Sequence, residues 1–308
     1  MREIQITDLE GVRIGNAQDD EAKTGVTVLI FDKGACVGVD ISGGGPASRE
    51  TPLTSPVTAD NPINALVLSG GSAFGLAASD GVMRYLEEHG VGFDTGYAKV
   101  PLVCQSCIYD LGYGRADVRP DALMGYAACE NAQKNHPVSG SVGGGTGATV
   151  GKLYGMERSM KGGLGIYAAA VGELKMAAVV VVNALGDIYD PEHNQKIAGL
   201  LTEDKKGFLD TCQELYKLRE RTELFNSNTT IGAVITNGRF SKAEMTKIAS
   251  MARNAYARCI RPVGTMADGD TIYGASVGEV EADLNMAGTL AAEVLAKAIQ
   301  DAFSRTDQ

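Results

Sequence analysis

The sequence predicts an α/β protein in which helices cover layers of β-sheet, and two patterns support this. Short runs rich in valine, isoleucine and alanine are bounded by glycine, as expected for buried strands. Longer segments instead repeat apolar residues at helical spacing. Strands and helices are mixed along the chain, with no internal repeat and no low-complexity linker, so we expect them to pack in layers. The composition, 44% hydrophobic and 21% charged over 308 residues, is that of a globular protein.

Seven runs are predicted as strands, and several are apolar on both faces, which suits a position between two layers. They are residues 25–31, 35–41, 65–68, 164–171, 176–182, 231–236 and 271–275. Helices are predicted at 73–88, with Ser72 as the N-cap, at 242–258 and at 284–303. The densely charged stretch 202–228 predicts a surface helix followed by an exposed loop, which leads into the strand at Ile231.

Charge and composition exclude two classes of partner. The formal net charge is −10, no basic run exceeds two residues and aromatic residues make up only 6%, so nucleic acid is not an expected partner. The longest strongly apolar run, 176–182, is far shorter than the ~20 residues that span a bilayer. Residues 1–15 lack the apolar stretch of a signal peptide. We therefore expect a cytoplasmic protein that does not bind membranes, with its six cysteines reduced.

Two glycine-rich loops could suggest nucleotide binding. Residues 143–148 satisfy the G-x-G-x-x-A pattern, but a turn precedes them and no acidic residue follows about twenty positions later. Close approach of the backbone to a neighbouring segment explains these glycines better. Residues 69–75 join a predicted strand to a predicted helix, so their amides could bind an anion. This loop lacks the Lys-Ser/Thr ending of a phosphate-binding loop, which argues against ATP or GTP.

The sequence also gives little support for a metal site or for a catalytic triad that contains histidine. Cys104 and Cys107 form a single C-x-x-C pair, whereas a zinc site would need further ligands nearby. The three histidines, His89, His136 and His193, lie in unrelated contexts, and no G-x-S-x-G elbow is present. We therefore expect two buried thiols, with no metal and no cofactor.

A hydrolase poor in histidine needs another base. One solution is a threonine that becomes a new N-terminus by self-cleavage, because its α-amine, with a pKa of roughly 7.7–8.0, can then accept the hydroxyl proton. Such a residue should follow a polar loop and begin a buried strand. Thr229, between Asn228 and the predicted strand at Ile231, has this setting. From spacing alone, an ordinary turn before a strand explains these residues better, because many strands begin after Asn-Thr.

Residues 228–237 resemble the nucleophile segment of the self-processing L-aminopeptidase/D-esterase (β-aminopeptidase) family. Other segments match in the same order: 45–51, 68–76, 80–82, 142–148, 161–165, 182–186, 260–262 and 268–271. The resemblance implies a single domain, 1–308, folded as a four-layer α-β-β-α sandwich similar to N-terminal-nucleophile hydrolases. It implies self-cleavage between Asn228 and Thr229 into chains 1–228 and 229–308, a homo-oligomer, commonly a tetramer, and a small peptide, amide or ester as substrate.

The resemblance also assigns roles to single residues. Thr229 would be the nucleophile, Asn183 the side-chain donor to the oxyanion, and Tyr109 a phenol donor. Asp268 and Asp270 would lie near the amine of the nucleophile and stabilise its protonated form. Each assignment has a structural alternative. The asparagine fits a turn at the end of a strand, the tyrosine an amphipathic wall, and the two aspartates a turn in which carboxylates cap backbone amides.

Two positions depart from the family pattern. In the best-known branch a glutamate that binds the ammonium group of the substrate stands where this chain has Cys107, and Gly264 replaces a frequent histidine. The predicted function is a self-cleaving aminopeptidase or amidohydrolase that works through an acyl-enzyme on Thr229. Two alternatives remain: acyl transfer, as in ornithine acetyltransferases, and a protein that never cleaves and binds an anion on loop 69–75.

Overall fold

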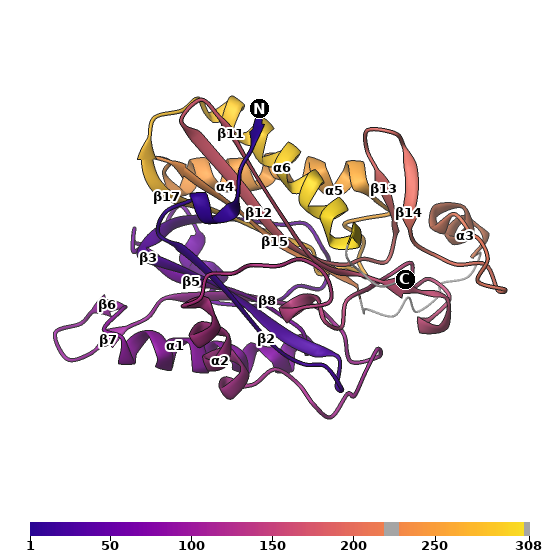
Figure 1. Ribbon diagram of the computed structural model, residues 1–308, viewed down its shortest axis with the longest axis horizontal. Helices are drawn as coiled ribbons and strands as arrows, with labels where there is room; N and C mark the ends of the chain where they lie inside the picture. Colours follow the sequence, from indigo (N-terminus) through magenta and orange to yellow (C-terminus); the bar gives the residue numbers. More distant parts are fainter. Residues whose placement is uncertain (219–227, 305–308) are drawn as a thin grey trace.

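The computed structural model describes residues 1–218 and 228–304. Two stacked β-sheets lie in the middle, helices α4, α5 and α6 cover the outer face of one sheet, and α1 and α2 cover the outer face of the other (Figure 1). The four-layer α-β-β-α sandwich expected from the sequence is confirmed.

The first sheet has the strand order β1-β11-β12-β15-β17-β3. Its strands are β1 (Arg2–Glu3), β11 (Gly163–Val171), β12 (Leu174–Asn183), β15 (Thr229–Gly238), β17 (Thr271–Val280) and the second half of β3 (Thr24–Ile41). Neighbouring strands are antiparallel except β15 and β17, which are parallel. The three neighbouring strands β12, β15 and β17 therefore bring segments from the middle and the end of the chain side by side.

The second sheet consists of the first half of β3 with β2 (Val12–Asp19), β5 (Ile63–Ser69), β8 (Val103–Cys107) and β4 (Ala47–Arg49). The runs 25–31 and 35–41, predicted as two strands, form one continuous strand, β3, that takes part in both sheets. Its register with β5 shifts between Ile30 and Ala35, where the strand leaves one sheet for the other. Strands β2 and β8 were not predicted.

Three apolar layers fill the spaces between these elements. In β12, Val179 and Val181 face the other sheet, whereas Val180 and Val182 pack against the helices α4 to α6. This alternation explains why the strand is apolar on both faces. The alternation continues to the end of β12. An odd-numbered residue there therefore points its side chain into the space between the two sheets.

The helices agree with the predictions in part. They are α1 (Ala78–Glu88), α2 (Ala122–Ala132), α3 (Thr211–Lys217), α4 (Lys242–Ala252), α5 (Asn254–Cys259) and α6 (Leu284–Ser304). The helix predicted at 284–303 is confirmed, that at 242–258 is divided at Arg253, and α2 was missed. The helix predicted at 73–88 begins with a 3-10 turn, and Ser72 is not its N-cap, because its φ of 54° lies in the left-handed region.

Short elements complete the chain. They are β6 (Phe93–Asp94), β7 (Lys99–Val100), β9 (Thr149–Val150), β10 (Met160–Lys161), β13 (Asp187–Asp190), β14 (Gln195–Ala198) and β16 (Ile260–Arg261). The surface helix predicted within 202–228 corresponds to α3, but the exposed loop predicted after it falls on 219–227, outside the described residues. Glycine loop 143–148 makes the close approach that was expected, since a Cβ on Gly145 would lie 2.2 Å from Leu164 N.

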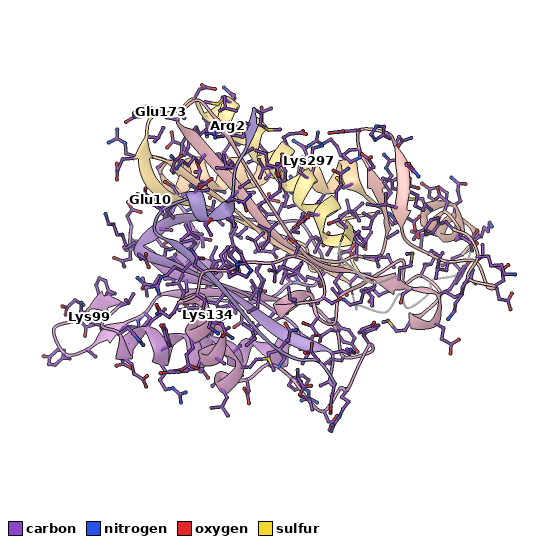
Figure 2. All side chains as sticks on the ribbon, viewed as in Figure 1. Arg2, Glu10, Lys99, Lys134, Glu173 and Lys297 are labelled. Carbon is purple, nitrogen blue, oxygen red and sulfur yellow. The ribbon has the colours of Figure 1, made fainter. Side chains whose placement is uncertain are left out.

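Charged side chains gather on the outside of the four layers. Lys99, Lys134 and Glu173 are exposed, and Lys99 and Glu173 lie at the edge of the view in Figure 2. Among the described residues, no helix combines the length and the apolar character that crossing a membrane requires.

Candidate active site

Thr229 begins β15 between two segments that carry the other predicted residues. On one side, Asn183 is its direct partner in the antiparallel pair β12–β15. On the other side, Asn228 forms a parallel bridge with Asp268. Directly opposed residues point to the same face of a sheet, so the side chains of Thr229 and Asn183 both face the space between the sheets. Thr229 is only 5% exposed.

The peptide bond between Asn228 and Thr229 is held by the neighbouring backbone. The carbonyl oxygen of Asn228 accepts a hydrogen bond from Gly269 N at 2.9 Å. The hydroxyl of Thr229 donates to the same carbonyl oxygen. Gly269 leaves no room for a side chain, since a Cβ there would lie 2.9 Å from Thr229 Oγ1 and 2.8 Å from Gly45 O. A hydroxyl nucleophile and a backbone N–H donor therefore meet at one carbonyl group. The sequence did not reveal the donor.

The side-chain amide of Asn183 is fully buried and its orientation is fixed from both sides. Its Oδ1 accepts from Thr149 N at 3.0 Å and from Lys152 Nζ at 2.9 Å. Its Nδ2 donates to the backbone carbonyl of Tyr109 at 3.2 Å. Two donors at Oδ1 exclude the flipped amide, because a flip would place the NH₂ group against them. The NH₂ group therefore points toward the Tyr109 side of the site.

Lys152 is the main residue of the site that the sequence did not single out. It is 7% exposed, and its Nζ donates to both O and Oδ1 of Asn183, each at 2.9 Å. Burial lowers the pKa of the ammonium group to about 7, although the carboxylates of Asp268, Asp110 and Asp270 act in the opposite direction. No sequence motif marks a lysine that follows a glycine-rich loop as a site residue. Only the fold shows that this lysine lies in the candidate site.

Asp268 and Asp270 both cap backbone amides, as the structural alternative suggested. Asp268 Oδ2 accepts from Thr265 N at 2.8 Å and from Thr265 Oγ1 at 2.6 Å. Asp270 Oδ1 accepts from Thr230 N at 2.6 Å, and its Oδ2 accepts from Gly264 N at 3.0 Å. Burial raises the pKa of both carboxyl groups. The charge of Asp268 adds to this effect on Asp270, and its pKa rises to about 7.

These two carboxyl groups and Lys152 form one buried ionisable cluster around Thr229. Lys152 lowers the pKa of each carboxyl group, and each carboxylate raises that of the lysine. Protons within such a cluster belong to the group as a whole rather than to single residues. Pairs with pKa values near neutrality are typical of catalytic sites, because they exchange protons at the working pH.

Tyr109 reaches the site through its backbone, whose carbonyl binds the Asn183 amide, and its side chain is half-buried. The adjacent Asp110 is buried and accepts from Gly71 N at 2.7 Å and from Thr24 Oγ1 at 2.6 Å. Gly70 N in turn donates to Gly25 O. The amides of Gly70 and Gly71 thus already donate to protein acceptors, and the acceptor of Gly71 N is a carboxylate, which repels anions. The structure therefore argues against an anion site on loop 69–75.

The two cysteines of the C-x-x-C pair are free thiols within β8, which confirms the expectation of buried thiols. Burial raises the pKa of both Cys104 and Cys107 to about 12. The Sγ of Cys107 lies 3.1 Å from Ser69 Oγ. At the position where the family glutamate was expected, this chain therefore places an uncharged group.

Comparison with known proteins identifies the family. Residues 5–308 match the model of Peptidase family S58. An uncharacterized aminopeptidase of Mycobacterium tuberculosis is 38% identical over 291 residues, which cover 89% of this chain and 82% of the relative. A 6-aminohexanoate-oligomer endohydrolase of Kocuria sp. is 30% identical over 321 residues, which cover 98% of this chain and 86% of the relative.

Solved structures show the same fold. The L-aminopeptidase D-Ala-esterase/amidase from Ochrobactrum anthropi, described as a variant of the Ntn hydrolase fold, matches with a TM-score of 0.71 and 17% identity, over 96% of this chain and 85% of that one. A Burkholderia sp. β-aminopeptidase matches with a TM-score of 0.70 and 19% identity, over 98% and 86%. The fold of this chain is thus the Ntn-hydrolase-like variant.

Proposed function

Because the chain belongs to Peptidase family S58, and is therefore a hydrolase of the aminopeptidase type, we propose that it cuts itself between Asn228 and Thr229. It then hydrolyses small peptides, amides or esters through an acyl-enzyme on Thr229. One observation carries the proposal: the Thr229 hydroxyl contacts the carbonyl oxygen of Asn228, which also accepts a hydrogen bond from the N–H of Gly269.

Self-cleavage follows from this contact. The hydroxyl oxygen of Thr229 attacks the carbonyl carbon of Asn228 through a five-membered ring, and the negative charge that develops on the carbonyl oxygen faces Gly269 N–H. The C–N bond breaks, the nitrogen takes up a proton, and an ester links the two residues. Water then hydrolyses the ester, which yields the carboxylate of Asn228 and restores the hydroxyl of Thr229, whose α-amine was freed when the C–N bond broke. The products are chains 1–228 and 229–308.

Lys152 is our candidate for the base of this first reaction. In the intact chain Thr229 has no free amine, so another group must accept its hydroxyl proton. Burial brings the pKa of Lys152 to about 7, so a neutral amine is accessible near neutral pH. Its two hydrogen bonds to Asn183, the cross-strand partner of Thr229, hold it at the same end of the strand pair.

In the mature enzyme the freed α-amine of Thr229 takes over as the base, and the hydroxyl attacks the acyl group of a substrate. The acyl-enzyme is released by water. Asp268 and Asp270 stabilise the protonated amine, Asn183 donates its NH₂ group to the oxyanion, and Tyr109 adds a phenol donor. Two contacts support the role of the carboxylates: the backbone of Asp268 forms a parallel bridge with Asn228, and Asp270 Oδ1 accepts from Thr230 N, the residue after Thr229.

The substrate is the least constrained part of the proposal. Relatives of this chain include both aminopeptidases and endohydrolases of 6-aminohexanoate oligomers. The neutral thiol of Cys107 offers no charge to an N-terminal ammonium group. A panel of aminoacyl amides, aminoacyl esters and 6-aminohexanoate oligomers distinguishes removal of an N-terminal residue from internal cleavage. We also expect a homo-oligomer, which light scattering on the purified protein tests.

The deciding experiment is the intact mass of the purified protein with three variants. Wild type and Thr229→Ser should give two chains, whereas Thr229→Ala should remain single and inactive. Thr230→Ala is the matched control. Its hydroxyl is buried one residue further along β15 and has no hydrogen-bond partner among the described residues, so its loss should leave cleavage intact. A folded wild-type chain that stays whole on long incubation contradicts the proposal.

A further inference from the structure

A second lysine, Lys161 in β10, lies behind the loop that holds the Asn183 amide. Its Nζ donates to three backbone carbonyls: Gly145 O at 2.8 Å, Ala148 O at 2.9 Å and Gly162 O at 2.8 Å. Three acceptors match the three N–H bonds of an ammonium group, and a neutral amine could satisfy only two of them. The side chain therefore ties the end of glycine loop 143–148 to the strand that follows it.

The residue after this loop contacts the active site. Thr149 N donates to Asn183 Oδ1 at 3.0 Å. In the short antiparallel pair β9–β10, Thr149 is the register partner of Lys161 itself. Gly162 N donates to Ala148 O, which closes the same turn from the other side. The position of the Thr149 N–H thus depends on a turn that Lys161 fastens at three points.

We propose that Lys161 is a positioning residue for the Asn183 amide. It acts through the loop: the three carbonyl bonds hold residues 145–148, and this keeps the Thr149 N–H directed at Oδ1 of Asn183. That donor and Lys152 are the two contacts that exclude the flipped amide. The inference rests on the proposed function, in which the NH₂ group of Asn183 serves the oxyanion.

Several charged groups surround Lys161. Burial lowers the pKa of its ammonium group to about 7, Asp110 acts in the opposite direction, and the charge of Lys23 adds to the lowering. The ring of Tyr113 lies 5.6 Å from Nζ. Asp110 accepts a hydrogen bond from Gly71 N, and the carbonyl of its neighbour Tyr109 accepts from Nδ2 of Asn183. Lys161 and Asp110 thus each support one of the two loops that contact the two ends of the amide.

The test compares Lys161→Met with a matched control, Lys242→Met. Lys242 is also a buried lysine, and its Nζ donates to Leu53 O at 2.9 Å, Thr58 Oγ1 at 3.2 Å and Ala59 O at 2.5 Å, in a loop outside the site. Two quantities are measured on the full chain: the rate of self-cleavage and the hydrogen exchange of the Thr149 amide.

Lys161→Met should slow cleavage by about tenfold or more and speed exchange at Thr149, whereas Lys242→Met should change neither by more than about threefold. If Lys161→Met does not fold, Lys161→Gln keeps two N–H donors and should cleave at an intermediate rate. A folded Lys161 variant that cleaves at the wild-type rate overturns the inference.

A double-mutant cycle separates positioning from general support of the fold. If Lys161 acts through Asn183, then Lys161→Met should slow the Asn183→Ala variant by less than about threefold, because the amide it positions is already absent. Full additivity of the two effects overturns the inference. If the wild type never cleaves, the proposed function fails separately. The exchange measurement then decides alone, and unchanged exchange at Thr149 in Lys161→Met overturns the link.

Discussion

Replacing Asn183 by aspartate should separate the two tasks of this side chain. Aspartate keeps an oxygen where Oδ1 accepts from Thr149 N and Lys152 Nζ, but it has a second oxygen in place of the NH₂ group. The two hydrogen bonds that Oδ1 accepts are thus retained, whereas the donor to the oxyanion and the hydrogen bond from Nδ2 to the Tyr109 carbonyl are lost. Asn183→Ala removes all of them.

The magnitudes follow from these contacts. Loss of one oxyanion donor typically slows a reaction by about 10²–10³-fold, or about 2.7–4 kcal/mol of transition-state stabilisation. Both variants should show this loss. Asn183→Ala also leaves the buried N–H of Thr149 without its acceptor and takes one acceptor from Lys152. A buried donor without an acceptor costs about 1–3 kcal/mol, so the alanine variant should lose roughly this amount of stability through Thr149 N alone, a loss that the aspartate variant avoids.

Self-cleavage is followed by intact mass, and the free energy of unfolding is measured with urea in a Thr229→Ala background, where every chain stays whole. The reasoning is refuted if Asn183→Asp cleaves at the wild-type rate, because the NH₂ group then plays no part. It is equally refuted if Asn183→Ala is as stable as the Thr229→Ala background, since the two accepted hydrogen bonds would then contribute nothing.

Three further changes test the ionisable cluster and the glycine beside it. Lys152→Met should slow self-cleavage by about 10²-fold near pH 8 and far less near pH 5, where the wild-type lysine is already protonated. An equal ratio of wild-type to variant cleavage rates at both pH values would exclude Lys152 as the base. Asp270 binds its proton more tightly in the folded than in the unfolded chain, so its contribution to stability falls by a few kcal/mol as pH rises from about 4 to about 7. The free energy of unfolding in urea should therefore depend less on pH in Asp270→Asn than in the wild type. An unchanged dependence on pH would contradict the raised pKa. Gly269→Ala places a methyl group against Thr229 Oγ1 and should slow cleavage by at least about tenfold, which intact mass over time will show.

The sequence predicted the strands β3, β5, β11, β12, β15 and β17 but missed others whose character depends on distant partners. Strand β8 contains Gln105 and Ser106, which read as polar loop residues, yet both are buried. Gln105 Nε2 donates to Ser69 Oγ at 2.8 Å, and Ser106 Oγ lies 2.8 Å from the hydroxyl of Tyr273, 167 residues away. A buried polar strand is recognisable only when its hydrogen-bond partners are known.

The interruption predicted within β3 has a different cause. Asp32 and Lys33 are exposed, and Gly34 has a φ of 76°, which together look like a turn between two strands. The chain instead changes sheets there without reversing its direction. Local residues reveal that regular pairing stops, but whether the strand then folds back or continues into a second sheet depends on what packs around it.

The same distinction holds for the site. Thr229, Asn183 and the two aspartates could be named in advance because a family pattern marks them. Lys152 and Gly269 could not. The lysine acts on an asparagine 31 residues away, and the glycine contributes a backbone N–H, which every residue except proline possesses. Only the register of β12, β15 and the 268–270 segment turns these common groups into parts of one site.

The charge of the cluster would favour the proposed self-cleavage. With all groups ionised, Lys152, Asp268 and Asp270 carry one excess negative charge in a buried space, and this excess contributes to the raised pKa of Asp270. Cleavage would create an ammonium group on Thr229, beside Asn228 and its bridge to Asp268. That new positive charge would balance the excess and lower the pKa of both carboxyl groups. The reaction would therefore relieve an electrostatic cost built into the intact chain, and it would leave the mature amine beside ionised carboxylates, which the proposed mechanism requires.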